Sequence, residues 1–322
     1  MKKLIFLTFI IGFSLSAKAE SFNRYKKKVI DVDSHDMSPK RPWIKVYKNE
    51  QENIKRLIAI LKQSKTGRKI LTRAKKKANR EGKTLVKLFR AGEGSLLDTT
   101  LVRRFSQANP DKIYYKNKST IYINQRHGTL NAVLDMAHEL THFTFRKPFN
   151  PYIGNFRPDE FVKSTVEGLG GEVDAYLIEC KVLYELYPKQ ASSLSNCEKV
   201  RDLETGHFSK KVGVAQFYKV GQHVRSYSEE LKSLNLKMYQ FPYLSSSTAT
   251  FISSAWGLPY PLAALKEYKT IMGKVCHNDQ KRLVIMQQNV SRSPASVSQR
   301  RSQVQRFEDF NSDFKNRCQP FI

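Results

Sequence analysis

The residues with the clearest chemistry form the string His138-Glu139-Leu140-Thr141-His142. It lies in a stretch from Leu130 to Phe145 that contains no Pro or Gly and is flanked by apolar residues, as expected for a helix. Side chains four residues apart on an α-helix point the same way, so the two imidazoles can bind one Zn²⁺ ion. Glu139 lies beside them and can act as general base toward a water molecule. The string predicts a hydrolytic zinc site, against the alternative of a helix with two incidental histidines.

A tetrahedral catalytic zinc site needs a third protein ligand and keeps its fourth position for water. The chain continues from residue 143 to Pro148 without the third His of the metzincin pattern, so this ligand has to come from another segment. We expect a second helix from residue 159 or 160 to about residue 187, which offers Glu167, Glu172 and Glu179. Helical spacing puts Glu172 on a small and apolar face, Glu167 on a more open side, and Glu179 two turns deeper. Glu172 is the expected ligand, Glu167 the runner-up, and a structural buried carboxylate the alternative.

The HELTH helix, followed about thirty residues later by Glu172-Val173-Asp174-Ala175-Tyr176, resembles the gluzincin metallopeptidases. The run from Ser64 to Arg68 ahead of a helix is similar to compact bacterial members, and the resemblance covers roughly residues 50 to 190. It implies that two His of HExxH and a Glu on the next helix hold the zinc. Thermolysin-like members have an Asp four residues after that Glu to orient a zinc His. Here that position is Tyr176, and Asp135 stands at a flank position that is usually uncharged.

The mechanism implied is hydrolysis of a peptide bond. Glu139 would take a proton from the attacking water and deliver it to the leaving amine. A further donor should stabilise the oxyanion that forms on the carbonyl. The sequence offers four such donors beyond the ligand Glu, namely Tyr176, Tyr218, His223 and Tyr227.

The surrounding pattern predicts an α+β fold. The resemblance implies that this fold is zincin-like, with a small antiparallel sheet packed on the HExxH helix and on the second ligand-bearing helix. Two strands, 112–115 and 120–124, are expected to form a hairpin around a turn at 116–119, and residues 101–105 to add a third strand. Thr129 is the expected N-cap of the HExxH helix. We expect residues 120–124 to form the sheet edge with which an extended peptide pairs, so the substrate would be a polypeptide or the peptide part of peptidoglycan.

The pattern along the chain predicts five segments. A positive start, an apolar run and Ala17-Lys18-Ala19 indicate a signal peptide over residues 1–19, so the protein would be exported to the periplasm or secreted. An extended segment over 20–47 leads to a catalytic core over 48–190. A helical C-terminal part over 191–290 and a polar basic tail over 291–322 follow. We expect residues 291–306 of this tail to be flexible or solvated. No later stretch is apolar and long enough to cross a membrane.

Four cysteines, at positions 180, 197, 276 and 318, favour disulfides in an exported chain. We expect Cys180 to pair with Cys197 and Cys276 with Cys318, because these pairs close the shortest loops. No CxxC pair is present, which argues against a zinc site built from cysteines.

The charge is strongly positive, with 56 Lys and Arg against 29 Asp and Glu and a net charge of +27. Residues 48–90 alone hold 15 Lys and Arg against three Glu. Such a face can dock an anionic envelope surface, or it can simply be a solvated helix face. Nucleic acid is an improbable partner, because the basic residues are not interleaved with aromatic ones and the chain is expected to be exported. The competing hypothesis for the whole protein is a non-catalytic, cationic envelope- or polyanion-binding protein.

Overall fold

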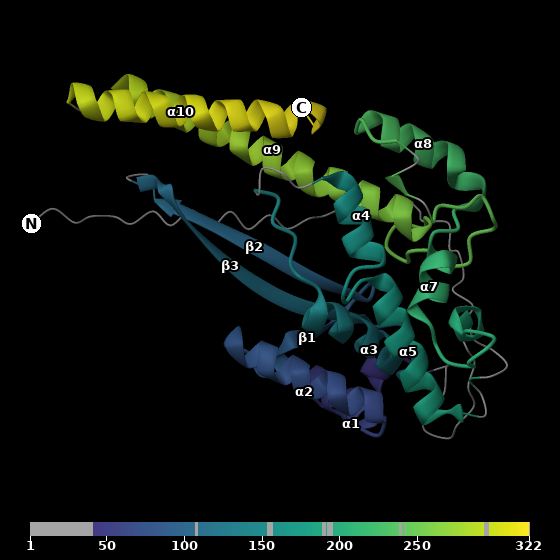
Figure 1. The fold of residues 1–322 in the computed structure, drawn as a ribbon. Coiled ribbons are helices and arrows are strands. Elements are labelled where there is room, and N and C mark those ends of the chain that lie inside the picture. Colours follow the sequence, from purple (N-terminus) through teal and green to yellow (C-terminus); the bar gives the residue numbers. More distant parts are fainter. Residues whose placement is uncertain are drawn as a thin grey trace, which may run out of the picture.

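The computed structural model describes residues 41–106, 109–152, 157–188, 191, 196–237, 240–241, 243–292 and 296–321. The expected signal peptide and the segment up to residue 40 lie outside the described residues. The elements, in chain order, are η1 (Trp43–Lys45), α1 (Glu50–Leu61), α2 (Lys65–Arg80), η2 (Val86–Leu88), β1 (Phe89–Gly92), β2 (Leu96–Ser106), β3 (Asn109–Asn124), α3 (Thr129–Phe145), α4 (Pro158–Val166), α5 (Glu172–Leu186), η3 (Asn196–Val200), α7 (Lys210–Phe217), η4 (Gly221–His223), α8 (Val224–Ser233), α9 (Tyr260–Arg292), α10 (Val297–Cys318) and η6 (Gln319–Phe321). The described chain is therefore a mixed α and β structure (Figure 1).

The sheet has three strands in the order β1-β3-β2. β1 pairs with β3 in parallel and β2 pairs with β3 antiparallel. The sheet is therefore mixed, whereas we expected an antiparallel one. The hairpin expected around residues 116–119 is wrong, because these residues continue β3 and lie opposite residues 99–102 of β2. The side chains of Lys116 to Ser119 favour a turn locally, but pairing with the long β2 strand overrides that preference. The third strand expected over residues 101–105 is confirmed as part of β2.

Helix α3 lies at the centre of the fold, in contact with α1, α2, α5, β2 and β3. Its residues are buried on several sides, which agrees with the absence of charged residues from most of its length. Thr129 is its first residue and Gly128 occupies the N-cap position without a side-chain cap, so the expected cap is one position off. The Thr129 hydroxyl instead accepts a hydrogen bond from Arg56 of α1.

Helices α1 and α2 cover the side of the sheet opposite α9 and α10 (Figure 1). Ser64 caps α2 by accepting a hydrogen bond from the Gly67 amide, so Gly67 lies in the first turn of α2. A Cβ atom at Gly67 would lie 2.0 Å from the Leu61 carbonyl oxygen. Glycine is needed there because the two helices meet too closely for a side chain.

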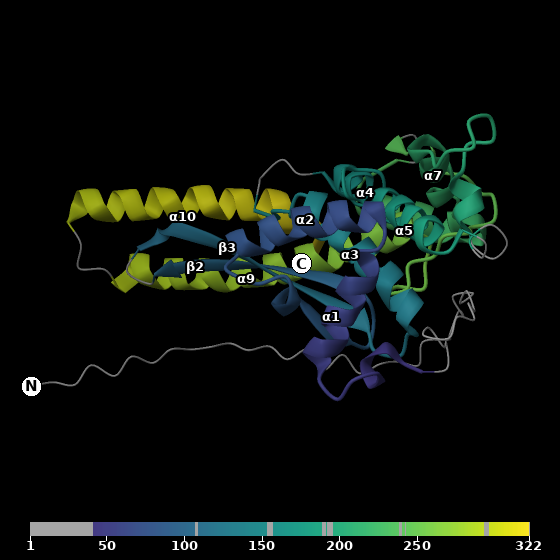
Figure 2. The ribbon, with the colours of Figure 1, turned by 90° about the horizontal axis from the view of Figure 1, so that it is seen from below.

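Helices α9 and α10 form a long antiparallel pair that runs in the same general direction as the β2–β3 ribbon (Figures 1 and 2). The polar tail expected over residues 291–322 contains this second helix, so it is not flexible throughout. A capping box at Ser296 and Gln299 starts α10. Phe307, Phe310 and Phe314 recur at helical spacing and pack on the core, which explains why a polar segment folds.

Both expected disulfides are confirmed. Cys180 of α5 is bonded to Cys197 of η3, and Cys276 of α9 is bonded to Cys318 at the end of α10. Disulfides persist in oxidising compartments, so the two bonds agree with an exported protein. Among the described helices, none has the length and apolar character that a membrane span requires.

Candidate metal centre

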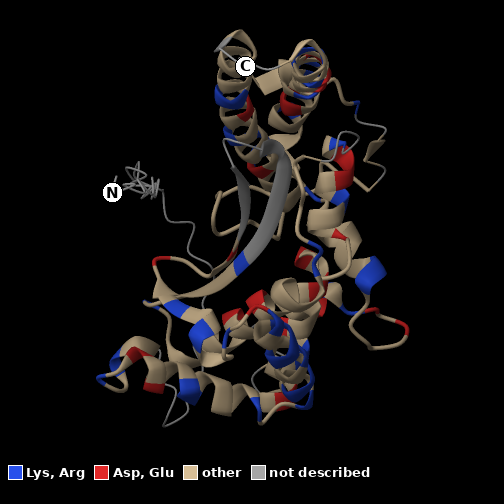
Figure 3. Cartoon of the chain, turned by 90° about the vertical axis from the view of Figure 1, so that its left-hand side faces the viewer, with Lys and Arg blue, Asp and Glu red and all other residues tan. Residues whose placement is uncertain are grey.

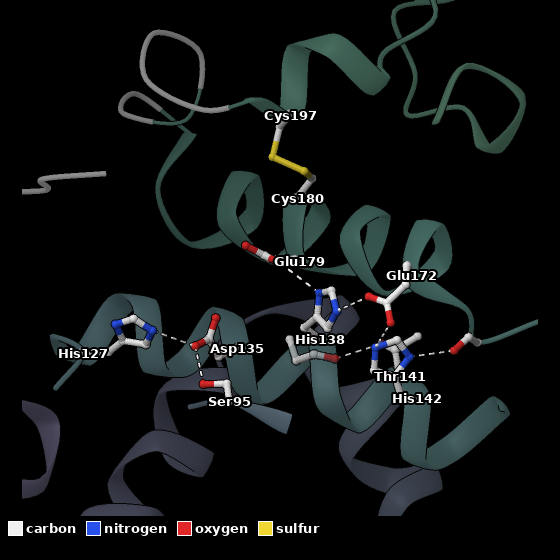
Figure 4. A network of polar contacts seen from close by, with 12 residues as sticks. Ser95, His127, Asp135, His138, Thr141, His142, Glu172, Glu179, Cys180 and Cys197 are labelled. Carbon is white, nitrogen blue, oxygen red and sulfur yellow. Dashed lines mark hydrogen bonds and ion pairs between the residues drawn. A yellow bond between two sulfur atoms is a disulfide. The ribbon is translucent and has the colours of Figure 1, made fainter. Parts of the chain in front are cut away.

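His138 and His142 lie one turn apart on α3, and their ring centroids are 4.8 Å apart. The absence of Pro and Gly keeps the helix regular through this turn, so both rings project toward α5 (Figure 4). The His142 side chain is 6% exposed and that of His138 is 13% exposed. Burying two imidazoles costs free energy unless partners satisfy their nitrogens.

The partner that α5 supplies is Glu172. Its Oε2 atom lies 3.3 Å from Nε2 of His138, and its Oε1 atom lies 3.4 Å from Nε2 of His142. The three donor atoms all lie within 4.8 Å of one another. The structure therefore brings together the expected ligand and the two histidines.

The turn before Glu172 explains how the carboxylate reaches this place. The single helix expected from residue 159 to 187 is two helices, α4 and α5, separated by residues 167–171. Gly170 in this turn has a φ of +70°, and a Cβ atom there would lie 2.5 Å from the Arg146 amide nitrogen at the end of α3. Only glycine fits this left-handed close approach. Glu172 consequently begins α5, where the helix N-terminus stabilises its negative charge.

Glu167, the runner-up, lies outside this cluster. It is the C-cap of α4, and its Oε1 atom accepts a hydrogen bond of 3.1 Å from the Tyr218 hydroxyl. The placement of Glu167 and Glu172 on different sides of one helix assumed that the helix is continuous. The break at residues 167–171 makes that placement invalid. Burial, with the nearby Glu167 carboxylate, raises the pKa of Tyr218 far above its ordinary value.

The Nδ1 atom of each histidine has an oxygen acceptor of its own. Nδ1 of His142 lies 2.8 Å from the Gly170 carbonyl oxygen, and Nδ1 of His138 lies 3.2 Å from Oε2 of Glu179 (Figure 4). A carbonyl can only accept, so Nδ1 of His142 carries the proton and Nε2 is left free to accept or to ligate. Glu179 lies seven residues after Glu172, and its carboxylate is the acidic partner of His138 Nδ1 on α5. Tyr176 at that earlier position packs instead against Phe217 and Phe251.

Electrostatics hold the Glu172 carboxylate ionised. Burial alone would raise its pKa, but His142 and His138 outweigh burial and hold the pKa far below its ordinary value. For His138, burial alone would lower the pKa, whereas the hydrogen bonds to Glu172 and Glu179 hold it well above its usual range. An ionised carboxylate and two oriented imidazoles form a donor set that suits Zn²⁺.

Glu139 lies in the same region as the three donor residues. Its side chain is buried and lines the cavity that His138, His142 and Glu172 also line. Burial raises the pKa of Glu139, although the two histidines oppose this. A carboxylate with a raised pKa is a better proton acceptor than an ordinary one, which is the property that a general base needs.

A second cluster joins the HExxH helix to the sheet. Oδ2 of Asp135, one turn before Glu139, lies 2.5 Å from the Ser95 hydroxyl and 3.1 Å from Nε2 of His127 (Figure 4). Ser95 directly precedes β2 and also accepts a hydrogen bond from the Asn124 amide of β3. Asp135 thus fixes the start of β2 against α3.

The cavity beside the donor set has a volume of about 740 Å³. Leu96, Leu97 and Thr99 of β2 line one side, and residues of α9 line the other. The expectation that residues 120–124 form the sheet edge is wrong, because β3 lies between β1 and β2. β2 borders the cavity and is the strand with which an extended chain could pair.

The four expected oxyanion donors, Tyr176, Tyr218, His223 and Tyr227, are not among the residues that line this cavity. Tyr227 is buried against Phe241, and His223 ends the short helix η4. The structure instead brings Tyr260, the first residue of α9, to the cavity wall. Burial and the neighbouring carboxylates of Glu172, Glu179 and Glu139 raise its pKa well above the ordinary value. In the sequence, Tyr260 is marked only by its position beside Pro261 at the start of a long helix. That position does not indicate that Tyr260 lies near His138.

Comparison of the chain with protein-family models, with curated proteins and with solved structures gives no match. The features of this chain that indicate a function are therefore the donor set, Glu139 and the cavity beside them.

Proposed function

We propose that this protein is an exported zinc metallopeptidase with a zincin-like core, which hydrolyses peptide bonds in polypeptides of the cell envelope or in the peptide part of peptidoglycan. The observation that carries the proposal is the convergence of His138, His142 and Glu172 beside a cavity that Glu139 also lines. Two disulfides support an oxidising compartment.

His138, His142 and Glu172 would hold the ion, with Glu179 and the Gly170 carbonyl orienting the two rings. Bound there, Zn²⁺ supplies Lewis-acid polarisation of the scissile carbonyl and lowers the pKa of a water ligand. Glu139 accepts the proton of the attacking water and passes it to the leaving amine nitrogen. Water and one peptide bond are consumed, and one carboxylate and one amine are formed.

The substrate chain would lie extended between β2 and α9. Backbone groups of β2 can hydrogen-bond to an extended peptide and so fix it in the cavity. Tyr260 would be the oxyanion donor, since it borders the cavity and its raised pKa keeps the hydroxyl protonated.

The test combines metal analysis with cleavage mapping on a proteome-derived peptide mixture. The purified protein should retain about one zinc ion per chain after dialysis. Glu139→Gln should retain zinc and lose cleavage, whereas His142→Ala should lose both. A Glu139→Gln protein with full peptidase activity contradicts the mechanism. A wild-type protein that binds no zinc contradicts the metal site and leaves the non-catalytic, polyanion-binding alternative.

A further inference from the structure

Helix α2 presents an exposed positive face that the catalytic proposal does not use. Between residues 65 and 80 it contains eight Lys and Arg and no Asp or Glu. Its apolar side is buried in the core. Seven of its basic side chains are exposed: Lys65, Arg68, Lys69, Arg73, Lys75, Lys76 and Arg80. At helical spacing these seven fall within about 160° around the axis, so they form one continuous face about 24 Å long.

This charge is not balanced by acids of the described residues, among which no ion pair involves any of the seven. Two carboxylates beside α2 serve other groups. Glu81 accepts hydrogen bonds from Ser119, and Glu185 accepts them from Ser64 and Thr66. The positive face of α2 is therefore available to an outside partner.

Two guanidinium groups are fixed on this face. Arg68 donates hydrogen bonds to the Lys62 and Gln63 carbonyl oxygens, and Arg73 lies 5.0 Å from the centroid of the Phe145 ring. Phe145 ends the HExxH helix, and Lys77 donates a hydrogen bond to the Phe143 carbonyl oxygen of the same turn. The basic face is thus joined rigidly to the helix that carries His138 and His142.

The shape of this face favours one class of partner. A single convex helix cannot enclose a small anion. No aromatic side chain lies on α2, so the face lacks the stacking surfaces with which proteins hold single-stranded nucleic acid. Basic side chains spread along a helix match an extended planar array of phosphates, as found on a bilayer with anionic lipids. Helix α10, on the far side of the molecule, mixes both signs of charge (Figure 3).

We propose that α2 docks this protein on a bilayer that contains anionic phospholipids. Attraction between the basic side chains and the lipid phosphates supplies the binding, because the apolar side of α2 is already buried and cannot insert. The docking does not depend on the metal and goes beyond the proposed peptidase activity. It would hold the HExxH helix close to the membrane surface, so that the site meets envelope polypeptides there.

Vesicle co-sedimentation of the full purified protein tests this. The vesicles are phosphatidylcholine alone, or phosphatidylcholine with about a third phosphatidylglycerol. The variant Lys69→Gln, Lys76→Gln, Arg80→Gln removes three charges spread along the face. Each basic residue near an anionic surface contributes a factor of about five, so the triple variant should bind about 100-fold more weakly. The wild type should bind only the anionic vesicles, less as salt rises, and equally with or without a chelator.

The matched control removes the same number of charges from α10, as Arg300→Gln, Arg301→Gln, Lys315→Gln. All three side chains are exposed, and the helix lies across the sheet from α2. This control should bind anionic vesicles within about threefold of the wild type. Circular dichroism and thermal melting should show that both triple variants are folded.

Three results overturn the proposal. The first is equal weakening by the α2 and α10 variants, which would show attraction by net charge alone. The second is binding to phosphatidylcholine as strong as to the anionic vesicles. The third is tight binding of a single-stranded oligonucleotide, lost in the α2 variant, by a protein that does not sediment with vesicles. Loss of peptidase activity in Glu139→Gln with unchanged vesicle binding keeps the two proposals separate.

Discussion

Replacing Glu179 should weaken zinc binding without removing a ligand. Its Oε2 atom lies 3.2 Å from Nδ1 of His138, and the two side chains are 12% and 13% exposed. A buried carboxylate in this position fixes the ring and makes the opposite nitrogen a better electron donor, and losing it costs 10- to 100-fold in metal affinity. Glu179→Gln keeps an oxygen that can accept from Nδ1 but loses the charge, so we expect about tenfold. Glu179→Ala loses both, so we expect about 100-fold.

The assay is competition for zinc between the metal-free protein and a chromophoric chelator, with the free energy read from the ratio of dissociation constants. The expected losses are about 1.4 and 2.7 kcal/mol. Glu167→Gln is the matched control, because Glu167 bonds to Tyr218 and not to a histidine. Glu172→Ala should lose more than either Glu179 variant. The reasoning fails if Glu179→Ala binds zinc as the wild type does, or if Glu167→Gln weakens zinc as much as Glu179→Gln.

Three further predictions concern the parts of the fold that hold the site. In urea unfolding, Gly170→Ala should destabilise the protein by about 1 to 3 kcal/mol more than Gly206→Ala. Both glycines have a positive φ, but only at Gly170 would the new Cβ atom lie within 2.5 Å of a backbone atom. Equal losses of stability would show that the close approach costs nothing. Replacing the cysteines of the Cys276–Cys318 bond by Ser should cost about 4 kcal/mol, because the bond closes a separation of 42 residues, and an unchanged melting temperature would refute this. Burial would raise the pKa of Glu185, but the hydrogen bonds that its carboxylate accepts outweigh burial and lower the pKa. The ionised carboxylate therefore stabilises the fold above the unfolded-state pKa, and this stabilisation is lost as pH falls through the folded-state pKa. The stability difference between wild type and Glu185→Gln should shrink in acid, and a difference that grows there would contradict the assignment.

Short-range patterns predicted correctly that His138 and His142 lie side by side on one helix. His138 and His142 are related by one turn of a helix, and no distant contact is needed to bring them together. Cys276 and Cys318 were also paired correctly, because loop length alone favoured that pairing. Such features can be predicted from sequence because local geometry and tertiary structure favour the same arrangement.

Contacts between distant segments were not predictable in the same way. Residues 116–119 have the composition of a turn, yet β2 makes them part of a long strand. Tyr260 is more than 100 residues from the HExxH motif, and only the packing of α9 brings it to the cavity. Helical spacing places Glu179 two turns beyond Glu172, but its contact with His138 depends on the separation between α3 and α5, which no pattern in one helix encodes.

The break between α4 and α5 is the feature that sequence periodicity missed and on which the donor set most depends. Gly170 accepts from Nδ1 of His142 through its carbonyl and donates to Asp174 through its amide, while its positive φ turns the chain sharply toward α3. A continuous helix would leave this carbonyl bonded within the helix and unable to orient the histidine. The break also places Glu172 at the helix N-terminus, where a negative charge is stabilised. One left-handed glycine therefore provides both the orientation of one histidine and the position of the third donor.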